Sequence, residues 1–278
     1  MIALFRTEFV KAAVRVRTLV VVAVLIALPT LIVVAIKARG DRPGRGQNGE
    51  GLFRLAQQSG LLVPAAVLGV ASGFLLVVIA GLLAGDSVAS DSAWGNLRYV
   101  LMRPVSRTRL LLAKAAVAAA LIWACVIVVA LTALVAGLIA FGSHPVTVPL
   151  VSGGGVGSFT LSTTTILVRV AVGTAYVAFG FTALLAIGTF MSTLTDTPTG
   201  AIGATIGIYI VSEILDGIDQ LGEVRYGFPT HYLSAWQPLL TENRWSGDIA
   251  AGIIVQLAYL VVFGAAAIIW FRRKDIRS

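Results

Sequence analysis

The sequence is poor in charged residues: Asp, Glu, Lys and Arg make up 12% of its 278 residues, compared with about 25% in soluble domains. Hydrophobic residues make up 58%, which exceeds the roughly 45–50% that soluble domains reach with glycine included. A soluble protein of this length has no interior large enough for that much apolar surface. The composition therefore excludes an ordinary soluble domain and indicates a membrane protein.

Cysteine and histidine are nearly missing, which excludes several kinds of site. The single cysteine, Cys125, permits no intrachain disulfide and no Cys-x-x-Cys pair. His144 and His231 lie in different predicted loops, without the spacing of a metal-binding pair. No lysine follows a glycine, so the Gly-Lys pair of a P-loop is missing. We therefore interpret the glycine-rich stretch 151–155 as a flexible loop between spans rather than as part of an ATPase.

The sequence contains long runs without charged residues. A bilayer core about 30 Å thick requires about 20 apolar residues in a helix. We predict six spans: Thr18–Ile36, Leu61–Gly85, Ala115–Gly142, Val170–Thr195, Thr197–Ser212 and Ile249–Phe271. No loop reaches the length of about 50 residues at which soluble domains begin. The expected fold is an all-α polytopic membrane protein with one transmembrane domain over residues 1–278.

The basic residues predict the orientation. With the N-terminus in the cytoplasm, 13 Lys and Arg lie in inner segments and 7 in outer segments. This bias favours a cytoplasmic position for both termini, although five basic residues in the first outer loop count against it. The net charge of +8 is thus interpreted as a topology signal, and no nucleic-acid partner is expected.

Residues 1–17 predict a helix that lies in the membrane interface. Apolar side chains from Ile2, Phe5 and Phe9 share one helical face, while Lys11 and Arg15 lie opposite. A basic amphipathic helix before a span is typical of an interfacial segment. The alternative is that this stretch is the frayed start of the first span.

Residues 86–114, between the second and third spans, form the most distinctive polar segment. A stretch of small and acidic residues leads to Trp94-Gly95, and an apolar-basic alternation then ends at Arg103-Pro104. Pro104 ends a helix and Ser106 is expected to cap the next one. We expect a docking surface for a cytoplasmic partner. A positively charged loop that only sets topology is the alternative.

This segment resembles the corresponding one in permease subunits of the ABC type-two exporter family. The family pattern is an acidic residue, Gly-Thr-Leu, a Leu pair, Ser-x-Pro-Val-Ser-Arg and a downstream Lys. The matching residues here are Asp91, Gly95-Asn96-Leu97-Arg98, Leu101, Arg103-Pro104-Val105-Ser106-Arg107 and Lys114. Asp91 replaces the usual Glu and Asn96 the usual Thr.

The resemblance implies that the segment contains a coupling helix received by a cytoplasmic ABC ATPase subunit, present in two copies. ATP and magnesium would then bind to that partner, with no cofactor in this chain, and a second permease subunit would complete the complex in the cell membrane. The implied coupling residues are Asp86, Asp91, Trp94, Gly95, Asn96, Leu97, Arg98, Arg103, Pro104 and Arg107. The resemblance also implies short re-entrant helices over residues 217–248.

The outer end of the fifth span carries acidic residues every three positions, at Glu213, Asp216 and Asp219. Ionisable groups near a membrane core are functional candidates. We consider Glu213 and Asp216, with Tyr232 and Trp236 from the following segment, as candidates for an outer gate or substrate contacts. The alternatives are acids solvated beyond the headgroups and an ordinary loop with aromatic anchors at the interface.

Three glycine pairs with spacing of four, Gly69/Gly73, Gly81/Gly85 and Gly203/Gly207, allow close approach of helices. The pattern fits packing within one bundle and also fits a subunit interface.

We expect a permease subunit that moves an amphipathic, drug-like or lipid-like substrate. A stand-alone secondary transporter or channel is the alternative, and it would require intramembrane charges and broken helices. A membrane-embedded enzyme would require clustered His, Asp or Glu at one membrane face, which the inner segments lack.

Overall fold

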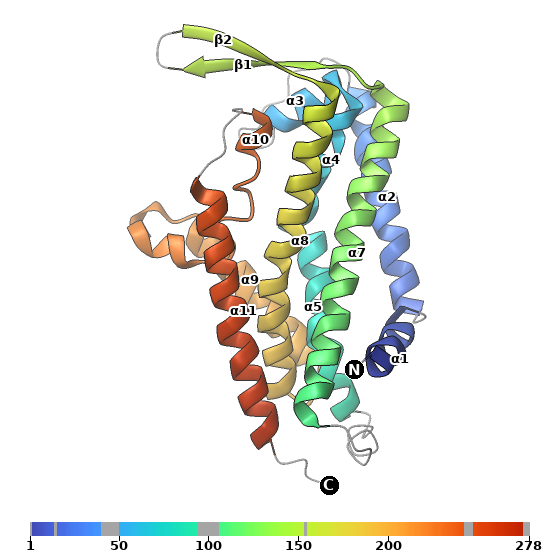
Figure 1. The fold of residues 1–278 in the computed structure, drawn as a ribbon, viewed down its shortest axis with the longest axis vertical. Helices are drawn as coiled ribbons and strands as arrows, with labels where there is room; N and C mark the ends of the chain where they lie inside the picture. Colours follow the sequence, from blue (N-terminus) through green and yellow to red (C-terminus); the bar gives the residue numbers. More distant parts are fainter. Residues whose placement is uncertain are drawn as a thin grey trace.

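The computed structural model describes residues 2–13, 16–39, 50–93, 106–152, 155–241 and 247–274. The elements are α1 (Ile2–Ala13), α2 (Val16–Arg39), α3 (Glu50–Gln58), η1 (Gly60–Leu62), α4 (Val63–Gly73), α5 (Leu75–Ala93), α7 (Arg107–Phe141), β1 (Val146–Ser152), β2 (Gly155–Leu161), α8 (Thr163–Leu194), α9 (Pro198–Asp216), η2 (Asp219–Gly227), α10 (Pro238–Thr241) and α11 (Gly247–Arg273). The long helices run along one axis, with the two strands across one end (Figure 1). We call this end the hairpin end. The other end, where α7 begins and α11 finishes, is the terminal end.

Six of these helices are long and apolar enough to cross a membrane, in agreement with the six predicted spans. They are α2 from Thr18 to Ala38, α5, α7, α8, α9 and α11. Large apolar side chains cover the outside of the bundle, including Leu31 at 69%, Ile139 at 81% and Ile254 at 67% exposure. Surface of this kind requires an apolar solvent. The chain is therefore a multi-pass membrane protein with an almost all-α fold.

Helix α8 forms the centre of the bundle and contacts α5, α7, α9 and α11. Small residues make this possible, because a side chain on Gly188 would meet Ala84 Cβ at 2.6 Å. Close approach at glycine lets helices associate by van der Waals packing where there is no hydrophobic driving force between them. Packing within one bundle, one of the two interpretations of the glycine pairs, is confirmed for Gly81 and Gly85, which pack against Ile206 and Ile202 of α9.

Helix α1 is separate from α2 and contacts α7 at the terminal end. Its Phe5 and Phe9 rings stack with centroids 5.9 Å apart. The predicted N-terminal helix is therefore present, and it is not a simple extension of the first span.

The prediction of one continuous second span was wrong, because the chain breaks between α4 and α5. Phe74 joins the two helices with φ −142° and ψ −58°, outside the helical region. The break follows a Ser-Gly pair, a common cause of helix kinks. The carbonyl of Ser72, which the break frees, accepts a bond from Tyr209 Oη of α9 at 3.2 Å, while Ser72 Oγ donates to Gly69 O within α4 at 3.1 Å.

Residues 146–161, expected to include a flexible loop, form an antiparallel hairpin in which Val146 pairs with Leu161 and Val148 with Phe159. Val146, Val148 and Leu161 are buried, at 1%, 4% and 2% exposure. Thr147 and Thr160 bond to each other across the exposed face at 3.3 Å. Alternation of apolar and polar residues, rather than the central glycines, determines the structure here.

Both flanks of the predicted coupling segment are helical. Helix α5 continues through the polar stretch to Ala93, and Ser87 and Ser90 donate their hydroxyls to α5 carbonyls, at 2.7 Å and 2.6 Å. Ser106 caps α7 as predicted, since its side chain accepts a bond from Arg109 N. The segment therefore begins and ends on spanning helices.

The segment between α9 and α11 contains the short helices η2 and α10 with turns between them. Helix η2 projects sideways from the bundle, and the chain then returns toward the hairpin end at α10 (Figure 1). Residues 231–236 are turns, and the Thr230 hydroxyl bonds to Ser212 of α9 at 2.8 Å.

Two glycine substitutions test how α5 and α9 pack. A Cβ on Gly85 would lie 2.7 Å from Ile202 N, whereas a Cβ on Gly203 would meet no atom within 4 Å. We expect Gly85→Ala to reduce the free energy of unfolding by about 1–3 kcal/mol through overpacking. Gly203→Ala is expected to leave it unchanged or raise it by up to about 1 kcal/mol through helix propensity. Thermal unfolding of the detergent-solubilised protein measures both, and equal melting temperatures would contradict the packing.

Candidate functional site

A buried lysine joins three helices beside the predicted coupling segment. Lys114 Nζ on α7 lies 2.6 Å from Asp91 Oδ2 of α5 and 3.3 Å from Glu8 Oε2 of α1. It also donates to Ser87 O of α5 at 2.9 Å. Exposure is 8% for Lys114, 21% for Asp91 and 15% for Glu8. We call these four residues the Lys114 cluster.

The burial of the lysine explains why two carboxylates surround it. A charged ammonium loses its hydration on burial, and only close carboxylates or carbonyls compensate for that loss. In the Lys114 cluster the three donors of the ammonium all have acceptors, so the charge is compensated. The cluster fixes the end of α5 against the start of α7 and against α1.

A second cluster joins the end of α11 to the connection between α8 and α9. Lys274 Nζ lies 2.7 Å from Asp196 Oδ1 and donates to Thr193 O at 3.0 Å. Ser92 Oγ of α5 donates to the same carboxylate at 2.9 Å. The hydrogen bond from Lys274, followed by that from Ser92, lowers the pKa of Asp196 below its ordinary value of 3.8.

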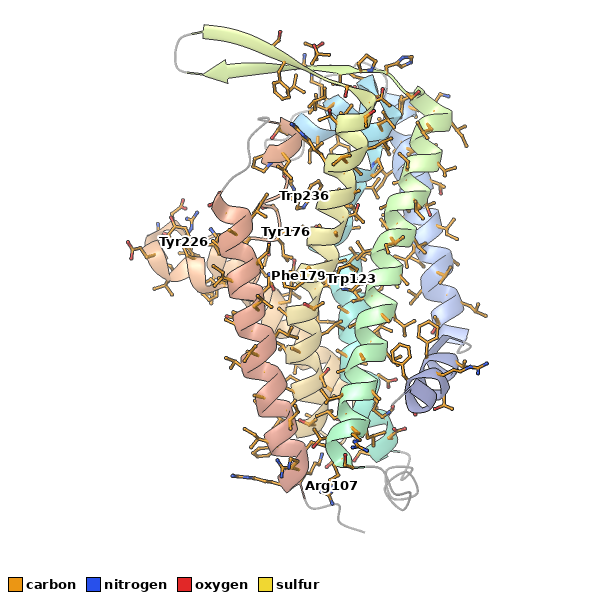
Figure 2. The ribbon with its side chains drawn as sticks, viewed as in Figure 1. Arg107, Trp123, Tyr176, Phe179, Tyr226 and Trp236 are labelled. Atoms are coloured by element: carbon orange, nitrogen blue, oxygen red, sulfur yellow. The ribbon has the colours of Figure 1, made fainter. Side chains whose placement is uncertain are left out.

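Arg107 links the beginning of α7 to the end of α11 by hydrogen bonds. Its Nη1 donates to Lys274 O at 2.8 Å and to Arg272 O at 3.5 Å. Carbonyls at a helix C-terminus lack intrahelical donors, and a basic side chain satisfies them. Figure 2 shows Arg107 at the base of the bundle, between these two helices.

The interior of α5 is also tied to α8 at this end. Ser192 is completely buried, and its hydroxyl oxygen accepts bonds from Val88 N at 3.0 Å and from Ala89 N at 2.9 Å. Helices α1, α5, α7, α8 and α11 are thus linked by polar contacts at the terminal end.

The structure brings together some of the residues that the sequence singled out. Asp91 and Lys114 form an ion pair, and Asp86 lies buried at 7% exposure one turn before Ser90. Arg107 begins α7. The remaining predicted coupling residues lie in 94–105, outside the described residues, and they are Trp94, Gly95, Asn96, Leu97, Arg98, Arg103 and Pro104.

Sequence reasoning missed the partners that complete these clusters, which are Glu8, Asp196 and Lys274. Glu8 lies on α1, and in the structure its carboxylate points into the bundle at Lys114. No spacing rule links Glu8, Asp91 and Lys114, since 106 residues separate the first from the last. Charge balance was the only available clue, because a lysine near a span requires an acid.

A different polar group lies nearer the hairpin end, around the segment after η2. His231 Nδ1 lies 2.5 Å from Asp216 Oδ1, and both residues are partly buried. Tyr176 Oη of α8 donates to Tyr232 O at 2.7 Å, and Gln256 Nε2 of α11 donates to Pro229 O at 2.7 Å. These contacts hold the returning chain against the bundle.

Trp236 lies inside the bundle, so the alternative of an aromatic anchor at the membrane interface was wrong for it. Its exposure is 1%, and its ring lies against Gly173 of α8, where no side chain could fit. Tyr232 is likewise buried at 8%. Figure 2 shows Trp236 and Tyr176 close together between α8 and α11. The other gate candidate, Glu213, lies one turn before Asp216 near the end of α9.

The described residues contain no group of three or more His, Cys, Asp or Glu side chains that could hold a metal ion.

Comparison with protein families gives one match. A family described as "Protein of unknown function (DUF2705)" matches residues 57–277. The chain belongs to this family. No curated protein matches it. The DUF2705 region contains Asp91, Arg107, Lys114, Asp196 and Lys274, whereas α1, with Glu8, precedes it. Most of the terminal-end contacts therefore lie within the DUF2705 region.

The Lys114 cluster predicts a large effect of removing its central charge. Lys114→Met leaves Asp91 and Glu8 without their shared cation, and we expect a loss of about 3 kcal/mol in the free energy of unfolding. Thermal unfolding in detergent measures it, with Arg109→Met, an exposed residue nearby, as the control. The double variant Lys114→Met/Asp91→Leu is expected to recover part of the loss. Equal melting temperatures for Lys114→Met and Arg109→Met would contradict the role of the cluster.

The lowered pKa of Asp196 predicts that acid pH weakly destabilises the fold. Its pKa is lower in the folded protein than in the unfolded chain, so the ionised form stabilises the fold. This contribution is complete above the unfolded pKa, near pH 4 and higher, and is lost as the pH falls through the folded pKa. Because the side chain is 69% exposed, the expected size is at most about 1 kcal/mol.

Asp196→Asn provides the comparison. We expect the variant to melt below the wild type at pH 6 and to approach it at pH 3. A difference that grows toward acid pH would contradict the lowered pKa of Asp196.

Proposed function

We propose that the chain is the transmembrane permease subunit of an ATP-driven exporter of the ABC type-two kind. The observation that carries the proposal is that both flanks of residues 94–105 are tied to the bundle by charged side chains. On one flank Asp91 and Ser92 of α5 bond to Lys114 and Asp196. On the other, Arg107 of α7 bonds to the end of α11. This segment is the one whose residues resemble the coupling region of that family.

The proposed mechanism is transmission of movement between chains. Two cytoplasmic ATPase subunits would receive residues 94–105, and ATP-driven closure of those subunits would push the segment. A flank that flexed would absorb the displacement. Here the Lys114 cluster and Arg107 would instead pass it to α1, α5, α7 and α11, so that the spans alternate between inward and outward access.

The remaining parts of the proposal follow from the same assignment. ATP and magnesium would bind to the partner, so this chain would not itself be the enzyme. A second permease subunit would complete the transport path, and both termini would lie in the cytoplasm of a cell-membrane complex. The walls of the described spans are mainly apolar, which favours an amphipathic, drug-like or lipid-like substrate over a small ion. Glu213 and Asp216 would then line the outer gate.

Copurification tests the proposal. We expect an affinity-tagged chain, extracted in mild detergent, to carry a partner with ATPase activity. Arg98→Ala is expected to reduce the amount of bound partner at least about fivefold, a loss typical of a contributing interface residue. Arg54→Ala, an exposed arginine of α3 near the hairpin end, is the matched control and should leave it unchanged. A chain that purifies alone, with transport unaffected by Arg98→Ala, would contradict the proposal.

The break at Phe74 favours a second candidate, a secondary transporter driven by an ion gradient. Discontinuous spans form the substrate and ion sites of many such transporters. In this chain, however, Tyr209 already donates to Ser72 O at the break, and Ser72 Oγ donates to Gly69 O. No ionisable residue occurs between Arg54 and Asp86. Transport that continues in vesicles without ATP and stops when an ion gradient is removed would favour this candidate.

A further inference from the structure

An apolar groove of about 390 Å³ lies between α7 and α11, with α8 as its floor. Its walls include Leu112, Ala115 and Ala119 of α7, Leu185 of α8, and Gly264 and Ile268 of α11. The volume lies within the range of about 300–1,000 Å³ that is typical of ligand pockets. In Figure 1 these three helices run side by side toward the terminal end.

The polar groups in the groove are already used within α8. Thr182 Oγ1 donates to Phe179 O at 2.6 Å, and Thr189 Oγ1 donates to Leu185 O at 2.7 Å. A polar ligand in the groove would therefore lose hydration without gaining hydrogen-bond donors from these side chains. The groove fits a hydrocarbon chain.

The length and position of the groove match one leaflet of a bilayer. Its lining runs from Leu111 to Ala119 on α7 and from Leu260 to Ile268 on α11. Eight residues of helix correspond to about 12 Å, and half of a bilayer core is about 15 Å. The groove begins four residues after the start of α7 and ends five residues before the end of α11. The groove therefore lies in the part of the bundle next to the terminal end.

Exposed arginines stand at this end of the groove. Arg109 precedes Leu112 by one turn on α7, and Arg272 follows Ile268 by one turn on α11, so each shares a helical face with a lining residue. Within the described ranges, neither guanidinium has a carboxylate partner. Three of the acids described at this end are committed elsewhere, since Asp196 pairs with Lys274 while Asp91 and Glu8 pair with Lys114, and Asp86 is buried in α5 at 7% exposure.

We propose that the groove binds an acyl chain of an anionic phospholipid, with the phosphate between Arg109 and Arg272. Guanidinium groups bind phosphate oxygens in a bidentate manner, and the apolar walls begin about one helical turn away. This would be a structural lipid site, independent of the proposed exporter function. A helix from a second copy fits less well, because it would bring the same unpaired arginines toward this basic rim.

Native mass spectrometry of the full chain, stripped of lipid in detergent and titrated with phosphatidylglycerol or phosphatidylcholine, tests the proposal. We expect one tightly bound lipid, with preference for phosphatidylglycerol. Arg109→Gln and Arg272→Gln should each reduce that preference about fivefold, as expected for one basic residue at an anionic headgroup. Arg54→Gln, near the hairpin end, is the charge control.

Gly264→Phe tests the hydrocarbon part. A Cβ on Gly264 meets no atom within 4 Å, so a phenylalanine there would occupy the groove without disturbing the backbone. We expect the bound lipid to be lost while the melting temperature in detergent stays within a few degrees. Val262→Phe, at an exposed position on the opposite side of α11, is the matched control.

Three results would overturn the proposal. The first is equal retention of both lipids by the wild type. The second is an unchanged preference in both arginine variants. The third is a change in oligomeric state, rather than in bound lipid, when Gly264 is replaced, which would mean that a second copy occupies the groove.

Discussion

Every backbone amide and carbonyl inside a bilayer must find its partner within the protein, because the hydrocarbon offers none. This constraint explains why the described chain is almost entirely helical and why its two strands lie at the end of the bundle. It also explains the side chains around each irregular point. At the break after Gly73, Tyr209 and Ser72 bond to carbonyls of α4. At the start of α7 the Ser106 side chain accepts a bond from Arg109 N, and at the end of α11 Arg107 donates to the carbonyl of Lys274.

The terminal end adds electrostatics to this constraint. Lys114 is nearly buried, so Glu8 and Asp91 must stay close to it. These two ion pairs connect α1, α5 and α7. Lys274, Asp196 and Ser92 connect α11, the α8–α9 turn and α5 in the same way. A bundle held by these charged contacts at one end would move as connected helices when that end is displaced.

The outer segment shows how burial changes the meaning of a residue. Trp236 follows the pattern of an interfacial anchor in the sequence, yet it fills the space left by Gly173. The carbonyls of Tyr232 and Pro229 accept hydrogen bonds from Tyr176 and Gln256, two polar residues within the apolar runs of α8 and α11. Single polar side chains, which have little effect on the mean hydropathy of a span, therefore hold the returning chain against the helices.

The number of spans, the N-terminal helix and the cap at Ser106 could be predicted from the sequence, because they depend on local hydropathy and on hydrogen bonds between near neighbours. The resemblance pattern also included Asp91 and Lys114, without relating them to each other. Their pairing with each other and with Glu8, the break of the second span at Phe74 and the pairing of β1 with β2 are visible only in the folded chain. Lys114 and Tyr209 bond to residues far away in the sequence, and such contacts exist only once the helices have packed.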